Sequence, residues 1–492
     1  MIGEQHLDTE ALIRKLWHYC NILRDDGLSY PDYVEQLTYL LFLKMADEQS
    51  TTHLPPEYSW KSFVDLSARE MHRHYGMALS ALSECSGMLA LIFRNAKNKI
   101  RDPAKLRLLV VELIGRTEWT GLPTDLKGDA YEGLLEKNAR DTKSGAGQYF
   151  TPRPLIEAIV ECVSPKPGEI VCDPACGTGG FLLSAHHYLV NRNPQMSKAE
   201  RSHLTRRAIR GVELVEEVAR LATMNLLLHG VAGRNENELP IECADSLRTP
   251  PRFKADVVLA NPPFGVKGSV KYTGEGRRLR GLDDDLTIVR PDFWVETANK
   301  QLNFLQHIAA MMKANARAAV VVPDNVLFEA GAAALIRRRL IETCDVHTML
   351  RLPPGLFYAQ GVKANVLFFD RRPALPTNGR KLWVYDVRSE SRFTRTRPLR
   401  RLDLQEFVDL YCSGRRKDRT AKAAVAARWR RFSTDEIAAS ADCSFDLTWS
   451  GVRAPIERGV HRLDEISRLL AEDLNRALAS IAEASLPKPS RE

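Results

Sequence analysis

A short apolar strand that runs through a glycine-rich turn into an apolar helix constrains the fold of this chain more than any other segment. The segment is Gly168–Leu183, with Ile170 and Val171 before the turn and glycines at 177, 179 and 180. In a doubly wound α/β sheet, the first strand ends in such a turn, and a ligand binds where the strand end meets the helix N-terminus. The segment therefore predicts a doubly wound (Rossmann-like) α/β fold with a ligand site beside the turn.

Two ligands fit a turn of this kind, a nicotinamide dinucleotide and S-adenosyl-L-methionine. The dinucleotide pattern G-x-G-x-x-G fails because Leu182 stands where the third glycine is required. Asp173 at the strand end would repel a pyrophosphate, but it attracts the ammonium and sulfonium charges of S-adenosyl-L-methionine. The turn therefore favours this second cofactor, with backbone close to its methionine part at Gly177, Thr178 and Gly179.

Two further strand-like runs also end in acids. The run Ala208–Glu213 places Glu213 to bind ribose hydroxyls, and the run ending at Asp245 and Ser246 places Asp245 to bind an adenine amino group. A strand that ends in an acid is common, so neither residue alone is strong evidence. Three such acids on successive strands predict a cofactor site along one edge of the sheet.

A fourth run, Ala255–Ala260, leads into the corner Asn261-Pro262-Pro263-Phe264. The second proline holds the first in an extended conformation, and each proline offers a carbonyl without an N–H. Asn261 and the Pro262 carbonyl are thus suited to accept the two hydrogens of an amino group on a flat ring, with Phe264 stacked on that ring. The alternative is an ordinary Pro-Pro turn after a strand.

The segment Lys143–Pro154, which contains Gly-Gln-Tyr-Phe-Thr-Pro, resembles a motif of the methylation subunit of type I restriction-modification systems. These subunits are N6-adenine DNA methyltransferases. Similar segments are Tyr33–Met45, Val321–Phe328 and Gly361–Phe369, and the resemblance spans most of residues 7 to 390. It implies that Tyr149 and Thr151 complete the methionine pocket.

The resemblance also implies a reaction and a set of partners. The reaction is site-specific methyl transfer from S-adenosyl-L-methionine to adenine N6 in double-stranded DNA, with the target base flipped out of the duplex. Asn261 and the Pro262 carbonyl would draw N6 toward tetrahedral geometry, so that no strong general base is required. The implied partners are a DNA-specificity subunit, a second methylation subunit and a restriction/translocase subunit, since this chain has no translocase motif G-x-x-x-x-G-K-[ST].

Two other functions remain open at this stage. A protein-glutamine methyltransferase would bind an amide NH₂ at the same Asn-Pro-Pro-Phe corner, and a DNA-binding scaffold that has lost catalysis would keep the fold. The large helical N-terminus and Gln148-Tyr149 argue against the first alternative, and the intact Asp173, Asn261 and Phe264 argue against the second.

The composition limits the class of protein. At 492 residues the chain is longer than one core usually grows, and 44% hydrophobic residues are ample for packing. A net charge of +8 fits a nucleic-acid partner without proving one. Nine cysteines without paired C-x-x-C spacing indicate reduced thiols and no structural metal. The absence of a membrane-length apolar run and of a signal-peptide pattern predicts a cytoplasmic protein with no membrane partner.

We expect four regions along the chain: a helical N-terminal domain at 1–125, a methyltransferase catalytic domain at 126–390, a basic extension at 391–455 and a C-terminal helix at 456–492. Helical spacing of apolar residues defines the first, and alternating strands and helices, typical of a parallel sheet, define the second. Its later strands are expected at 318–322, 346–350, 365–369 and 382–385.

Four segments have two interpretations each. The basic stretches 392–401 and 415–431 are solvent-exposed surface or, because Phe393 and Trp429 interleave the charges, a contact to phosphate or a partner. The Gly- and Arg-rich segment 267–280 is a loop that closes over DNA or an unstructured insert. The apolar stripe Leu463–Ile481 predicts a helix that docks on the specificity subunit or folds back on its own chain.

Overall fold

The structure is a computed structural model. It describes residues 9–48, 54–117, 119, 151–231, 239–264, 287–353, 356–357, 363–372, 379–388, 393, 398–413, 428–447 and 449. The predictions for Tyr149, for the segment 267–280, for most of the stretch 415–431 and for the C-terminal helix 456–492 lie outside these residues.

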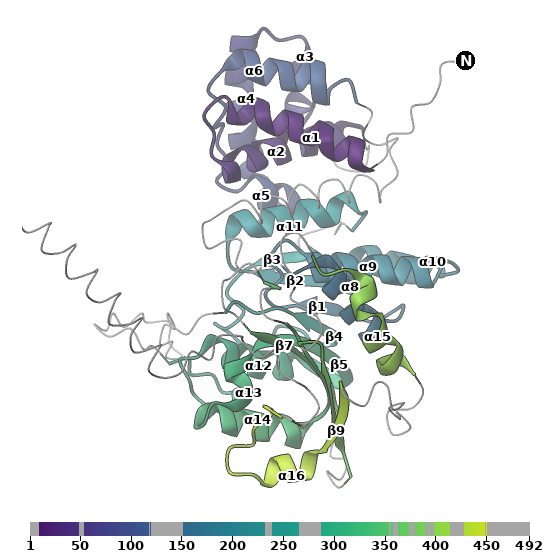
Figure 1. The fold of residues 1–492 in the computed structure, drawn as a ribbon. Coiled ribbons are helices and arrows are strands. Elements are labelled where there is room, and N and C mark those ends of the chain that lie inside the picture. Colours follow the sequence, from purple (N-terminus) through teal and green to yellow (C-terminus); the bar gives the residue numbers. More distant parts are fainter. Residues whose placement is uncertain are drawn as a thin grey trace, which may run out of the picture. The chain divides into compact units, whose positions relative to one another are not determined.

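A nine-stranded sheet in the order β3-β2-β1-β4-β5-β7-β6-β8-β9 forms the centre of the catalytic region (Figure 1). Its strands are β1 (Val171–Asp173), β2 (Ile209–Glu213), β3 (Ile241–Cys243), β4 (Ala255–Ala260), β5 (Met312–Pro323), β6 (Cys344–Arg351), β7 (Ala364–Arg371), β8 (Lys381–Asp386) and β9 (Trp429–Ser433). β1 pairs in parallel with β2 on one side and with β4 on the other. The strand order therefore reverses between β1 and β4, and in doubly wound sheets this reversal opens the ligand crevice.

The expected doubly wound sheet is confirmed, and all four later strands lie where the sequence predicts them. The expected parallel pairing is confirmed from β3 to β5 and between β6 and β8, but the sheet as a whole is mixed. β7 runs antiparallel to both β5 and β6, and β9 runs antiparallel to β8. Parallel neighbours require a long crossover, whereas the antiparallel neighbours β6 and β7 need only the connection 352–363.

Helices cover both faces of the sheet, with α8, α9 and α15 on one side and α12, α13 and α14 on the other (Figure 1). The helices of this region are α8 (Arg153–Val163), α9 (Gly180–Arg192), α10 (Lys198–His203), α11 (Glu216–Leu228), α12 (Lys300–Met311), α13 (Asp324–Phe328), α14 (Ala332–Thr343), α15 (Gln405–Cys412) and α16 (Thr434–Ala439). α8 buries its apolar side, including Leu155, Ile159 and Val163, in the core of the sheet. Among the described residues, no helix has the length and apolar character that a membrane crossing requires.

The N-terminal region is helical, as its periodic apolar residues predict. It consists of α1 (Thr9–Arg24), α2 (Tyr30–Glu48), α3 (Lys61–Val64), α4 (Ala68–Ser83), α5 (Gly87–Phe93), α6 (Pro103–Arg107) and the π-helical turn η2 (Leu108–Ile114). The stripes of α1 and α2 meet in one apolar core, which includes Leu16, Leu23, Leu37 and Leu40. These stripes are therefore core rather than an interface.

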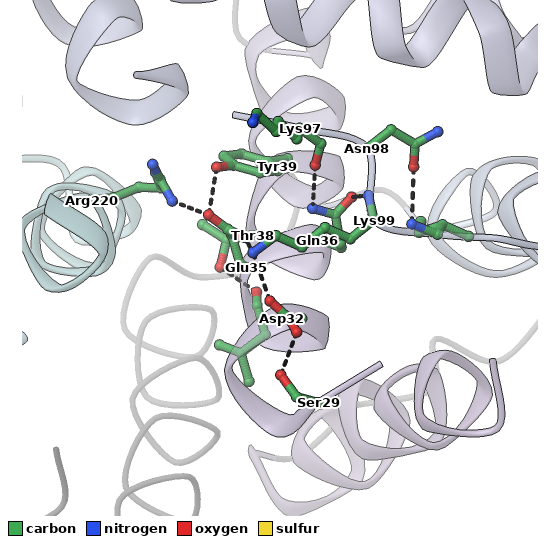
Figure 2. Close-up of polar contacts among 12 residues, drawn as sticks. Ser29, Asp32, Glu35, Gln36, Thr38, Tyr39, Lys97, Asn98, Lys99 and Arg220 are labelled. Carbon is green, nitrogen blue, oxygen red and sulfur yellow. Dashed lines mark hydrogen bonds and ion pairs between the residues drawn. The ribbon is translucent and has the colours of Figure 1, made fainter. Parts of the chain in front are cut away.

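α11 belongs to both regions. Its residues Ala219 and Leu226 pack into the core of the sheet, whereas Met224 and Leu228 pack into the core of the N-terminal helices. Figure 2 shows the polar part of this junction, where Arg220 of α11 forms a buried ion pair with a carboxylate of α2. The N-terminal helices are thus joined to the sheet through a helix that lies next to the predicted cofactor turn.

The sheet continues into the region predicted to be a basic extension. Trp429 of β9 stacks on Trp383 of β8, with ring centroids 5.0 Å apart, and Phe393 is also buried. The interpretation of Phe393 and Trp429 as contacts for phosphate or a partner is therefore wrong, because both rings are part of the core. Arg430 and Arg431, which follow Trp429 in β9, are exposed, in agreement with the surface interpretation.

Candidate cofactor and target-base site

The predicted cofactor acid and the predicted catalytic amide follow two neighbouring strands. Cys172 of β1 lies opposite Val258 of β4, so that Asp173 at the end of β1 and Asn261 after β4 share one edge of the sheet. Parallel neighbours lie about 4.8 Å apart. Two reactants bound at these positions would therefore be held close together by one rigid element.

Asp173 is a buried acid that has no cationic partner among the described residues. Its side chain is 1% exposed, and one carboxylate oxygen accepts the N–H of Ala175 at 2.9 Å. Burial raises the pKa of the Asp173 carboxyl to about 8; the Ala175 bond lowers it, and the nearby charge of Glu213 raises it further. A buried carboxylate of this kind suits a ligand that brings its own positive charge.

The conformation of the turn after β1 depends on its glycines and on hydrogen bonds to Glu213. Gly177 and Gly179 have φ angles of +54° and +86°, in the left-handed region that favours glycine. Glu213 accepts the N–H of Gly177 at 3.0 Å and the N–H of Val215 at 2.9 Å. A carboxylate has about four acceptor positions, so Glu213 retains capacity for the ribose hydroxyls that the sequence analysis assigned to it.

Asn225 of α11, a residue that the sequence did not point to, supports the same turn. Its side-chain N–H₂ donates to the Thr178 carbonyl at 3.1 Å, and Ala222 lies one turn earlier under Gly179. Asn225 is buried, although amide side chains are mostly exposed. Nothing in the helical pattern around Asn225 indicates this role, because the contact depends on how α11 packs against the turn.

The end of β3 is also tied to the turn after β1. Asp245 follows β3, and the hydroxyl of the next residue, Ser246, donates to the Pro174 carbonyl. The buried Arg290 donates to the Ser246 carbonyl at 3.2 Å and pairs with Asp292 at 2.6 Å. Arg290, which the sequence analysis did not single out, thereby fixes the loop that carries Asp245.

The structure brings Thr151 against Asn261. The Nδ2 of Asn261 donates to the Thr151 Oγ1 at 2.8 Å, and each side chain is 7% exposed. Thr151 stands directly before Pro152, which precedes the first residue of α8. A residue placed by resemblance in the methionine pocket thus contacts the residue predicted to hold the target amino group.

Two aromatic rings lie at the Asn-Pro-Pro-Phe corner. Phe264 meets Phe357 edge to face, with centroids 5.8 Å apart and an interplanar angle of 90°. Phe357 is buried and comes from the connection between β6 and β7. Phe264 is predicted from the sequence, whereas Phe357 is not, because the connection that carries it has no helical or strand periodicity.

The doubly wound sheet, the glycine turn with its buried acid, and the acceptor corner on the neighbouring strand define a class of protein, the S-adenosylmethionine-dependent methyltransferases. The model of the family described as "N-6 DNA Methylase" matches residues 123–440, and that of the "HsdM N-terminal domain" matches residues 12–54. The chain belongs to the N-6 DNA methylase family and, within it, to the adenine-specific methylase subunits of type I restriction-modification systems.

The individual relatives agree with this assignment. The type I restriction enzyme EcoKI methylase subunit of Escherichia coli (strain K12) is 36% identical, over 97% of this chain and 94% of that protein. The crystal structure of the EcoKI M protein has a TM-score of 0.53 and covers 97% of both chains. A structure from a study of complex assembly and conformational transition of the type I restriction-modification system has a TM-score of 0.73 at 26% identity, covering 97% of this chain and 98% of that one.

Proposed function

We propose that this edge of the sheet binds S-adenosyl-L-methionine beside the reacting adenine. The observation that carries the proposal is the adjacency of buried Asp173 and Asn261 at the ends of β1 and β4. On the cofactor side, the proposed ligands are Tyr149, Thr151, Asp173, Gly177, Thr178, Gly179, Glu213 and Asp245. The raised pKa of Asp173 and the left-handed glycines fit a cationic amino acid that approaches the backbone closely.

The bound cofactor supplies an electrophilic methyl group on its sulfonium. The chain's own task is to present the adenine amino nitrogen, whose lone pair is delocalised into the ring. The Oδ1 of Asn261 and the carbonyl of Pro262 accept its two hydrogens, which favours tetrahedral geometry and stabilises the developing positive charge. Phe264 holds the face of the base.

The proposed substrate is double-stranded DNA from which the adenine is flipped out. Flipping costs a few kcal/mol, which stacking and pocket contacts offset. The proposed partners are a DNA-specificity subunit, a second methylation subunit and a restriction/translocase subunit. Support comes from the relatives, which are named as methylase subunits of type I restriction enzymes.

The test is transfer of radiolabelled methyl groups to DNA by the chain assembled with its specificity subunit. Asn261→Ala is expected to lower turnover by about 10²- to 10³-fold, as the loss of one preorganised group at a reacting centre does, while calorimetry shows unchanged cofactor binding. Near-normal turnover of Asn261→Ala would overturn the proposed mechanism. Label found on protein instead of DNA would overturn the proposed substrate.

A further inference from the structure

Thr151 forms a hydrogen bond with Asn261, the residue proposed to hold the reacting nitrogen. Its hydroxyl oxygen accepts the side-chain N–H of Asn261, and both groups are buried next to the Asn-Pro-Pro-Phe corner. The bond ties one end of the Asn261 amide to the segment that begins α8. The other end of the amide, Oδ1, consequently points away from Thr151.

The orientation of this amide decides what it offers to the adenine. A carboxamide has an accepting oxygen and a donating NH₂ of nearly the same shape. Only Oδ1 of Asn261 is able to accept a hydrogen from the adenine amino group. In the reversed orientation, two NH₂ groups would face each other, which removes the proposed stabilisation and places like dipoles in contact.

A threonine hydroxyl alone permits both orientations, because it has one hydrogen and two lone pairs. It accepts from Nδ2 in one orientation and donates to Oδ1 in the other. When a separate acceptor takes the hydroxyl hydrogen of Thr151, only lone pairs remain for Asn261. The NH₂ end of Asn261 is then the one end that bonds, and Oδ1 is turned toward the base.

The position of Thr151 gives access to such an acceptor. The helix that follows it, α8, packs directly on the start of α9 after the cofactor turn: a Cβ at Gly180 would lie 3.0 Å from the Cδ1 of Ile156. Thr151 contacts the catalytic corner through Asn261, and the proposed function places it in the methionine pocket. The acceptor available on the cofactor side is the carboxylate of the methionine part.

We propose that Thr151 is a positioning residue that makes the orientation of Asn261 depend on the cofactor. The cofactor carboxylate takes the hydroxyl hydrogen of Thr151, and Thr151 then holds Asn261 with Oδ1 toward the adenine. The proposal rests on the proposed function, because it requires the methionine part beside Thr151. It links cofactor binding to target-base binding through two side chains.

The test compares Thr151→Val, which removes the hydroxyl at nearly constant shape, with Thr151→Ser, which keeps it. Thr38→Val is the matched control, because Thr38 is a buried threonine in α2 whose hydroxyl donates to its own helix at 2.7 Å. Each variant is assembled with the specificity subunit, and its thermal unfolding is recorded. The readouts are kcat at saturating cofactor and the affinity for unmodified duplex with and without S-adenosylhomocysteine, which keeps the carboxylate and has no methyl group to transfer.

Thr151→Val is expected to lower kcat at saturating cofactor about tenfold, the effect of one lost hydrogen bond to a positioned group. It should also remove the tightening of duplex binding by S-adenosylhomocysteine. Thr151→Ser and Thr38→Val should retain both properties. In an Asn261→Ala background, Thr151→Val should cost no further turnover, because the residue that it orients is already absent.

Three results would overturn this role of Thr151. One is a wild-type kcat of Thr151→Val at saturating cofactor, with only the cofactor dissociation constant raised. Another is a Thr151→Ser variant as impaired as Thr151→Val, which would assign the effect to packing. The third is a loss that persists in the Asn261→Ala background. None of these results affects the proposed function, which fails separately if Asn261→Ala itself turns over normally.

Discussion

Two carboxylates with little exposure, Glu35 and Asp173, differ in how their charge is balanced. Glu35 of α2 pairs with Arg220 and with Lys99, whose Nζ lies 2.6 Å from it, and it accepts the Tyr39 hydroxyl at 2.9 Å (Figure 2). Among the described residues, Asp173 at the end of β1 has one hydrogen bond, from a backbone N–H. The first carboxylate joins two regions of the protein, and the second lies at the proposed cofactor site.

We interpret Glu35 as a structural charge and Asp173 as a functional one, because only Glu35 has cationic partners among the described residues. Arg220 itself is well supported, since it also donates to the Arg94 carbonyl at 2.6 Å and lies 5.2 Å from the centre of the Tyr39 ring. Glu35 therefore finds its counter-charges within the chain. Asp173 is buried with no counter-charge in the described part of the chain, so we expect a cationic ligand to offset the free-energy cost of its burial.

The largest effect is expected when the structural pair is broken. Arg220→Met leaves Glu35 with Lys99 as its remaining cation, and removing one partner of a buried pair costs up to about 3–5 kcal/mol. Denaturant unfolding measures the loss. Arg339→Met is the control, because its pair with Glu342 is exposed. If Arg220→Met unfolds at the same denaturant concentration as the control, the Arg220–Glu35 ion pair does not stabilise the contact between α11 and α2.

The opposite sign is expected at the functional carboxylate. Asp173→Asn keeps the acceptor for Ala175 and removes the charge. The folded-state pKa of Asp173 is raised, so its contribution to stability is fully present below the unfolded-state pKa and is lost as the pH rises to about 8. The variant without cofactor should therefore be more stable than wild type at pH 8, by an amount on the order of a few kcal/mol.

The same variant should lose cofactor affinity by about 100-fold, the scale of one buried charge-assisted hydrogen bond. Calorimetric titration with S-adenosyl-L-methionine measures this loss, and chemical denaturation measures the gain in stability. A variant that is both less stable and fully able to bind cofactor would contradict the contrast between Asp173 and Glu35.

A smaller effect is expected from pH alone. Because binding of a cation requires ionised Asp173, cofactor affinity should increase about fivefold between pH 7 and pH 8, as the ionised fraction rises from about one tenth to one half. Titrations at a series of pH values give this profile. Asp173→Asn should give a flat profile over that interval, and a wild-type profile that is equally flat would show that Asp173 does not face the cation.

The smallest effect is expected at Lys99, the second partner of Glu35. Its side chain is 41% exposed, so water already screens the pair. Lys99→Met should cost less than about 1 kcal/mol in denaturant unfolding. A loss as large as that of Arg220→Met would mean that Glu35 depends on both cations equally.

The sequence predicted the strand ends of the site better than the contacts between them. Asp173, Glu213 and Asn261 lie at the ends of β1, β2 and β4. Their positions could be predicted because an acid or amide that follows a β-branched run is visible in the local sequence. Asn225 and Phe357 were missed because they reach the site from elements whose packing has no local signal. The antiparallel β7 was missed for the same reason, since strand direction depends on which neighbours meet.

The shared helix α11 limits how this protein is divided into exchangeable modules. Met224 and Leu228 complete the core of the N-terminal helices, yet they lie on the same helix as Asn225, which holds the cofactor turn. A chimaera that takes residues 1–117 from one relative and the remaining chain from another would pair N-terminal helices with an α11 from a different protein, so the side chains at their contact would not match. An exchange of the N-terminal helices between relatives therefore has to include the face of α11 that packs against them.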